Sequence, residues 1–315
     1  MWTLQQDGPG AFRKIVIDPP RGSDLRDGEV LVSFLAGSIC GSDIPKFLGH
    51  IDPFNQESGR SGSPLHELVG TVVESRSDDL APGTRVVGRL ASGRGLAELV
   101  TCPADNMIPV DGRLGDTTAT IVQPLATVFS ALDRIPDLAS KRIAVIGLGP
   151  LGLLFTHVLR SLGARNVTGI DRVDRSDCAE PFGINEVVAD DATRWAAGLG
   201  ERTFDLVIDV VGHSQEVIAA AVDALAPHGH MLVYGLPDAQ YVFPIRPFFR
   251  KNATMHGSHT DDWRPYLHRG QAYLLEHSRL PDDYITHIFP IDDAQEAYRL
   301  YSLPAVGRLK VSLTR

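Results

Sequence analysis

Residues 141–152 read Lys-Arg-Ile-Ala-Val-Ile-Gly-Leu-Gly-Pro-Leu-Gly, and this stretch decides the fold. An apolar run typical of a β-strand, Ile143 to Ile146, stops at Gly147, and Gly149 and Gly152 follow in G-x-G-x-x-G spacing. The first glycine makes a tight turn, the second lets the backbone approach a pyrophosphate, and the third lets a helix and a strand pack closely. The stretch therefore predicts a strand that turns into a helix at a phosphate-binding loop.

The residues after the turn support this interpretation. The apolar pattern from Leu151 to Leu159 has helical spacing, and a second strand, Asn166 to Ile170, ends at Asp171. The N-terminus of the helix offers free N–H groups and the positive end of its dipole to phosphates. We expect a dinucleotide to contact the residues of this turn, which are Gly147, Gly149, Pro150, Leu151 and Gly152.

An acidic residue at Asp171 favours NAD over NADP. Its carboxylate accepts hydrogen bonds from the adenosine ribose and repels a 2′-phosphate. Arg172 and Arg175 lie close by in the sequence, and guanidinium groups attract phosphate, so NADP stays open as the second choice.

Composition excludes several classes of protein. At 315 residues the chain is long enough for two domains, and 43% hydrophobic and 22% charged residues are typical of a globular protein. The net charge of −9 argues against a nucleic-acid partner, and no apolar run approaches the ~18 residues that cross a bilayer. The three cysteines are too few for a disulfide framework, and the N-terminus does not resemble a signal peptide, so we expect a cytoplasmic protein.

The chain changes character along its length. Up to about residue 110 it shows short β-prone runs between glycine, proline and aspartate clusters, which favours a barrel-like or sandwich domain. After Asp171, strands and helices alternate, which predicts a parallel doubly wound sheet in an α/β protein. From about Thr260 strands and helices no longer alternate, and we expect this C-terminal segment to belong to the first domain.

Two upstream segments carry side chains with metal chemistry. They are Cys40-Gly-Ser-Asp43 and Pro64-Leu-His66-Glu67-Leu-Val-Gly70. A thiolate and an imidazole are ligands of catalytic zinc. The same residues also occur as a buried apolar cysteine and a structural histidine, so the segments alone leave both interpretations open.

Taken together, these motifs resemble the medium-chain dehydrogenase/reductase superfamily, in its zinc-type alcohol, polyol and sugar dehydrogenase branch. The resemblance covers nearly the whole length, and its motifs are, in order, Cys40-Gly-Ser-Asp, His66-Glu67 and Gly70, Ala97-Glu98, Gln123-Pro-Leu-Ala, the glycine turn, Thr286-His287, Glu296-Ala297 and Lys310-Val311. It implies a β-rich GroES-like catalytic domain built from both chain ends, residues 1–122 and 259–315. It also implies a central Rossmann domain, residues 123–258, with substrate bound between the two domains.

The resemblance also implies roles for single residues. Cys40 and His66 match two zinc ligands, and Glu67 matches a carboxylate beside or on the metal. Asp43 matches the acid that orients the histidine, and Ser42 matches the hydroxyl that accepts the proton of the substrate alcohol. Thr127 and Leu151 match residues that pack around the nicotinamide.

Three departures from the family pattern change the expectation. The cysteine-rich lobe that binds a structural zinc is absent, so we expect one zinc ion. Gln123 occupies the third ligand position, as in similar archaeal glucose dehydrogenases; its neutral amide leaves one net positive charge on the site unless Glu67 also ligates. Pro45 replaces the histidine of the proton relay, and His50, further along the loop, is a candidate substitute.

The sequence thus predicts an NAD-dependent zinc enzyme that oxidises a small polyhydroxylated alcohol such as a polyol, sugar or cyclitol, or catalyses the reverse reaction. Relatives form dimers and tetramers, so a homo-oligomer is expected. Two alternatives stay open: a zinc-free NADPH-dependent reductase of the same fold, and a non-catalytic NAD-binding sensor whose metal site has decayed.

Overall fold

The computed structural model describes residues 1–50 and 60–315, which form two compact units. Unit 1 comprises Met1–Ala126 and Asp262–Arg315, and unit 2 comprises Thr127–Asp261. Both chain ends therefore belong to the same unit. Within the described ranges, no helix has both the length and the apolar character needed to cross a bilayer.

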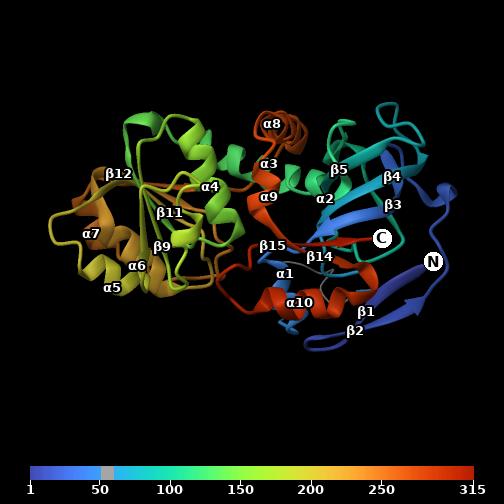
Figure 1. Cartoon of the computed structure of the whole chain (residues 1–315), viewed down its shortest axis with the longest axis horizontal. Coiled ribbons are helices and arrows are strands. Elements are labelled where there is room, and N and C mark those ends of the chain that lie inside the picture. Colours follow the sequence, from blue (N-terminus) through green and yellow to red (C-terminus); the bar gives the residue numbers. More distant parts are fainter. Residues whose placement is uncertain (51–59) are drawn as a thin grey trace. The chain divides into compact units, whose positions relative to one another are not determined.

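Unit 2 contains one fully parallel sheet, with strand order β10-β9-β8-β11-β12-β13 (Figure 1). Its strands are β8 (Arg142–Ile146), β9 (Asn166–Asp171), β10 (Glu186–Ala189), β11 (Phe204–Asp209), β12 (Leu225–Val233) and β13 (Thr254–Gly257). Its helices are α4 (Pro150–Ser161), α5 (Ala192–Ala197), α6 (Gln215–Ala224) and α7 (Ile245–Arg250). Figure 1 shows α4 on one side of the sheet and α5 and α6 on the other. The chain order reverses between β8 and β11, which is the topological switch point of a doubly wound sheet.

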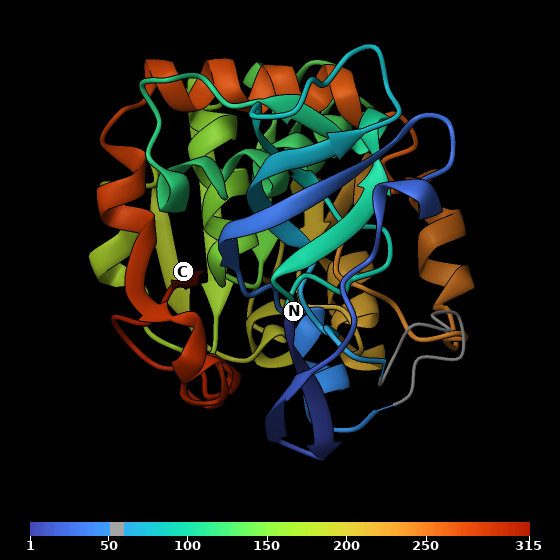
Figure 2. The same ribbon diagram turned by 90° about the vertical axis from the view of Figure 1, so that its right-hand side faces the viewer.

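Unit 1 is built on a mixed seven-stranded sheet in which β14-β15-β3-β4-β5-β7 are neighbours and β6 pairs with β3. Its strands are β3 (Glu29–Ser38), β4 (Glu67–Ser75), β5 (Arg85–Arg89), β6 (Leu99–Pro103), β7 (Met107–Pro109), β14 (Ile285–Pro290) and β15 (Lys310–Thr314), and a separate hairpin pairs β1 (Trp2–Gly8) with β2 (Ala11–Val16). Its helices are α1 (Asp43–Phe47), α2 (Asp116–Ala119), α8 (Trp263–Glu276), α9 (Leu280–Tyr284) and α10 (Ala294–Ser302), and α3 (Val122–Leu132) runs across the boundary of the two units. Figure 2 shows β3, β4 and β5 side by side.

The C-terminal strand β15 closes unit 1. It pairs antiparallel with β3, so that Ser312 lies opposite Ser38, and parallel with β14. The core beneath these strands is apolar and joins residues from both chain ends, including Phe34, Phe47 and Tyr298. Burial of this shared core holds the two distant segments together.

The predicted fold class is confirmed: the protein is α/β, with a doubly wound parallel sheet and a β-rich unit made from both ends of the chain. Two local predictions were wrong. The residue pattern of 175–182 predicts a short helix, but only a 3-10 turn forms there, Ser176–Cys178, and the helical pattern of 117–132 is divided in the structure into α2 and α3. Asp174 caps this turn, since its carboxylate accepts the N–H of Ser176 at 2.9 Å, but Pro181 lacks the N–H needed to continue it and disfavours helical backbone at Glu180.

Candidate active site and dinucleotide site

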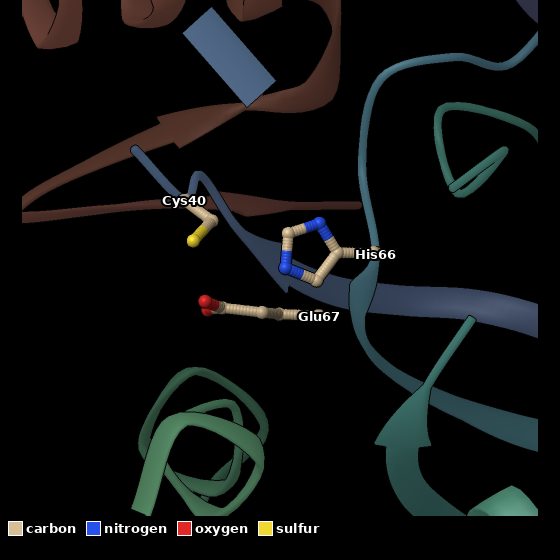
Figure 3. A group of neighbouring side chains, drawn as sticks. All are labelled: Cys40, His66 and Glu67. Carbon is tan, nitrogen blue, oxygen red and sulfur yellow. The ribbon is translucent and has the colours of Figure 1, made fainter. Parts of the chain in front are cut away.

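Cys40, His66 and Glu67 converge at one end of the β3–β4 pair. The register pairs Ser38 with Glu67, so the residues just beyond the end of β3 and just before the start of β4 are neighbours. The sulfur, an imidazole nitrogen and a carboxylate oxygen of the three side chains all lie within 4.8 Å of one another. Figure 3 shows the three side chains directed into one shared space. Among the described residues, this is the group of thiol, imidazole and carboxylate side chains whose spacing suits a metal ion.

Asp43 fixes the orientation of the imidazole. One carboxylate oxygen lies 2.9 Å from Nδ1 of His66, and the other accepts the backbone N–H of Cys40 at 3.0 Å. Because Nδ1 is engaged, the other ring nitrogen is the one left to face the cysteine and the glutamate. The predicted orienting role of Asp43 therefore has its hydrogen bond in the structure.

The charged groups around Cys40, His66 and Glu67 favour a positive charge at this site. Burial alone would lower the pKa of His66, but the charge and hydrogen bond of Asp43 outweigh burial and raise that pKa to about 10 in the metal-free protein. Burial likewise opposes ionisation of Asp43, yet His66 keeps the pKa of that carboxyl below its ordinary value. A divalent cation placed here would take over the role of the imidazolium proton.

Glu67 has a second partner that the sequence did not predict. Its Oε1 accepts a hydrogen bond from Nζ of Lys310 at 2.7 Å, its Oε2 lies 2.6 Å from the same nitrogen, and both side chains are only 1% exposed. Burial raises the pKa of Glu67, and Lys310 acts in the opposite direction. The sequence gives no signal for this burial, because Lys310 and Ser312 alternate with Leu309, Val311 and Leu313 as they would on a strand with one exposed face.

The other predicted residues of this site occupy nearby elements. Ser42 is half-buried directly before α1, and Pro45 lies inside that helix. Gln123 is buried in the first turn of α3. His50 is exposed after α1. Ligation by Gln123 and a proton relay through Ser42 or His50 stay predictions.

The donor set fits zinc. Thiolate, imidazole and carboxylate are its usual protein ligands, and bond lengths of 2.0–2.3 Å place tetrahedral ligand atoms about 3.5 Å apart. The three donor atoms, within 4.8 Å, need only small side-chain adjustments to reach that spacing.

The glycine turn in unit 2 has the features that a dinucleotide requires. Gly147 has φ +96°, a conformation that side chains rarely adopt. A Cβ on Gly152 would lie 1.8 Å from the carbonyl oxygen of Gly147, so only glycine permits this helix–strand packing. A Cβ on Gly149, by contrast, would meet no described atom within 4 Å, which leaves open space beside the backbone for a phosphate. Pro150 then starts α4, with Leu151 half-buried behind it.

Asp171 lies at the carboxyl end of β9, where the sequence predicts it. Its Oδ2 accepts the N–H of Leu148 at 2.7 Å and its Oδ1 that of Val173 at 2.8 Å, so the carboxylate also braces the glycine turn. Each oxygen keeps a lone pair for a ribose hydroxyl. The two predicted arginines differ, because Arg172 is exposed and Arg175 is buried.

Thr127, predicted to lie at the nicotinamide, forms a hydrogen bond with Tyr234: their hydroxyl oxygens are 2.5 Å apart. Tyr234 directly follows β12 and was not identified from the sequence. An aromatic residue at the end of a predicted strand, before Gly235, was the available signal.

Comparison with known proteins extends these observations. The family model for "zinc-binding dehydrogenase" matches residues 150–270, and the model for "alcohol dehydrogenase GroES-like domain" matches residues 26–112. D-arabinitol dehydrogenase 1 of Uromyces fabae is 25% identical, over 94% of this chain and 93% of its own length. L-idonate 5-dehydrogenase (NAD(P)(+)) of Escherichia coli strain K12 is 22% identical, over 92% of this chain and 93% of its own length.

Solved structures share the fold along the full chain. The structure of Haloferax mediterranei glucose dehydrogenase in complex with NADP, Zn and gluconolactone superposes with a TM-score of 0.81 at 20% identity, covering 100% of this chain and 99% of that one. The chain therefore belongs to the medium-chain dehydrogenase/reductase superfamily, in its zinc-dependent alcohol and polyol dehydrogenase branch, and it is an NAD(P)-dependent oxidoreductase that acts on CH–OH groups.

Proposed function

We propose that this protein is an NAD-dependent zinc enzyme that oxidises a hydroxyl of a polyol, sugar or cyclitol to a carbonyl, or catalyses the reverse reaction. The observation that carries the proposal is the convergence of Cys40, His66 and Glu67, with Asp43 orienting the imidazole. A non-catalytic chain has no need to keep this buried arrangement, because an ion pair such as His66–Asp43 costs desolvation energy that an apolar pair avoids.

Cys40 and His66 hold the metal in this proposal, with Gln123 as the third ligand and Glu67 beside or on the ion. A zinc ion at this position supplies Lewis acidity that polarises the oxygen of the substrate. Asp43 accepts the Nδ1 proton of His66 and so keeps the opposite ring nitrogen directed at the site. Ser42 accepts a hydrogen bond from the substrate hydroxyl and passes a proton on towards solvent; helix α1 has Pro45 in place of the imidazole that the family uses for this step.

The glycine turn and the N-terminus of α4 bind the pyrophosphate, and the oxidised nicotinamide accepts the hydride. Asp171 supports NAD as the preferred cofactor, because a 2′-phosphate would approach a carboxylate that is already fixed by two backbone N–H groups. Arg172 is exposed next to it and supports weaker use of NADP.

The polyhydroxylated substrate class is supported by the names of several relatives. They are dehydrogenases of arabinitol, idonate, galactitol 1-phosphate and glucose. All of these substrates carry neighbouring hydroxyls on a short carbon chain or ring.

A substrate screen tests the proposal. The wild-type protein, loaded with zinc or stripped with a chelator, is offered polyols, aldoses and aminocyclitols with NAD or NADP, and the absorbance of the reduced cofactor is followed. We expect zinc-dependent turnover with NAD that Cys40→Ala abolishes along with zinc binding. Activity that is indifferent to chelator and requires NADPH would identify the zinc-free reductase instead. Tight cofactor binding without turnover on any substrate would identify the sensor.

A further inference from the structure

One polar contact in unit 2 lies outside the metal site and outside the glycine turn. The hydroxyl oxygens of Thr127, in α3, and Tyr234, directly after β12, are 2.5 Å apart. The Tyr234 ring meets Phe155, in α4, edge to face, with centroids 4.7 Å apart and an interplanar angle of 83°. One helix therefore contacts the hydroxyl of Tyr234, and another helix contacts its ring.

The register of the sheet shows where this ring lies. Ile146 at the end of β8 pairs with Asp209 at the end of β11, which pairs with Val233 at the end of β12. The residues that follow these strands therefore form one row along the carboxyl edge of the sheet. Adjacent strands are about 4.8 Å apart, so Tyr234 lies about 10 Å from the glycine turn along this row.

The opposite direction along the row leads to the adenosine side. Ile146 also pairs with Ile170 of β9, and Asp171 follows Ile170. A dinucleotide with its pyrophosphate on the glycine turn and its adenosine ribose at Asp171 has only one direction left for its second nucleoside. That direction runs over the ends of β11 and β12, towards Tyr234.

The backbone at this end of β12 is fixed as firmly as the ring. The N–H groups of Tyr234 and Gly235 both donate to the carbonyl oxygen of Asp209, at 2.9 and 2.8 Å. Gly235 also packs so closely on Gly212, in the loop after β11, that a Cβ on it would lie 2.1 Å from the nitrogen of Gly212. The main chain of Tyr234 is therefore fixed to the sheet, and its side chain is fixed by contacts with α3 and α4.

We propose that Tyr234 is a positioning residue for the nicotinamide half of the cofactor, acting through its hydroxyl bond to Thr127. The inference rests on the proposed dinucleotide function. The Tyr234–Thr127 pair forms a surface against which the nicotinamide nucleoside packs. The adenosine half binds on the other side of the glycine turn and does not depend on this pair.

The test compares NADH with ADP-ribose, which keeps the adenosine, both phosphates and the second ribose and lacks only the nicotinamide ring. Dissociation constants for NADH and for ADP-ribose are measured by calorimetry on wild type, Tyr234→Phe, Thr127→Val and the double variant. We expect each single variant to weaken NADH binding about fivefold, because a ring released from its hydrogen bond must be ordered again when the nicotinamide binds, and to leave ADP-ribose binding unchanged. The double variant is expected to lose no more than either single variant, because both remove the same bond.

Tyr241→Phe is the matched control, since its hydroxyl accepts the N–H of Asp238 in the loop after β12 and has no bond to Thr127. It is expected to bind both ligands as wild type does. Unchanged NADH binding in both single variants, an equal loss for ADP-ribose, or the same loss in the control would overturn the inference. If Tyr234→Phe does not fold, Thr127→Val decides. A wild-type protein that binds neither ligand would refute the dinucleotide function itself, whereas binding without the predicted discrimination would refute only the role of Tyr234.

Discussion

Replacing Lys310 with methionine tests the charge balance at the metal site. The ammonium lies 2.6–2.7 Å from both oxygens of Glu67, and both groups are 1% exposed, so the variant leaves a carboxylate buried without its cation. The carboxyl avoids that state by taking up a proton. Starting from its ordinary pKa of 4.5, protonation costs about 3 kcal/mol at pH 7 and less than about 1 kcal/mol at pH 5.

We therefore expect the metal-free Lys310→Met variant to lose about 3 kcal/mol of unfolding free energy at pH 7 and much less at pH 5. The sign follows from the direction of the shift: a raised pKa in the folded state means that stability falls as pH rises above 4.5. Urea titration in the presence of a chelator, followed by circular dichroism, measures both values. Adding Glu67→Gln to the variant removes the orphaned charge, and we expect it to restore most of the stability at pH 7 and to abolish the pH dependence. A loss that is the same at both pH values, or a double variant no better than the single one, would refute this reasoning.

Further predictions concern the two binding sites. Asp43→Asn is expected to weaken zinc binding 10- to 100-fold in a chelator competition assay. Because zinc must displace the proton that His66 holds below a pKa of about 10, and ligation by Cys40 as a thiolate releases a second proton, the zinc affinity of the wild type should rise at least about tenfold per pH unit between pH 6.5 and 8.5. Gly152→Ala should lower the melting temperature and abolish NADH binding, whereas Gly149→Ala should fold normally and still bind NADH poorly, as NADH fluorescence would show. Asp171→Asn should weaken NAD binding more than NADP binding, which calorimetry can measure for both cofactors.

The sheet of unit 2 could be predicted because its strands are apolar runs ended by glycine or aspartate. The strands predicted over Ile143 to Ile146 and Asn166 to Ile170 are each only one residue longer in the structure, as β8 and β9. Strands buried on both faces carry their signal locally, so neighbouring residues suffice to locate them.

The elements that were missed owe their structure to partners distant in sequence. Strand β1 contains Gln5, Gln6 and Asp7 and lacks a β-type pattern, yet besides its hairpin with β2 it exchanges backbone hydrogen bonds with Leu96 and Glu98, more than 90 residues along the chain. Helix α7 is six residues long and contains Pro247, and its apolar residues Ile245 and Phe249, which share one face, are exposed. Tertiary pairing overrides local preference at both places.

For the candidate site, too, the types of residue could be predicted from the sequence, but most of their contacts could not. The sequence shows that Cys40 and His66 are residue types that ligate metals. Their proximity, however, depends on the β3–β4 register and was inferred only from the family resemblance. Lys310 is 243 residues from Glu67 along the chain, and no local pattern connects the two. Such a pair becomes visible only when the last strand is placed beside β3.

Lys310 also answers the question that the sequence left open about the charge of the metal site. With a thiolate and two neutral ligands, a divalent ion keeps one net positive charge, and ligation by Glu67 alone would cancel it. Lys310 brings its own positive charge to that carboxylate, so the Glu67–Lys310 pair adds no net charge to the site, whereas Asp43 behind His66 adds one negative charge. Ligation by Glu67 would draw the carboxylate away from Lys310, which would favour retention of the metal and reduce the stabilisation of a developing negative charge on the substrate oxygen.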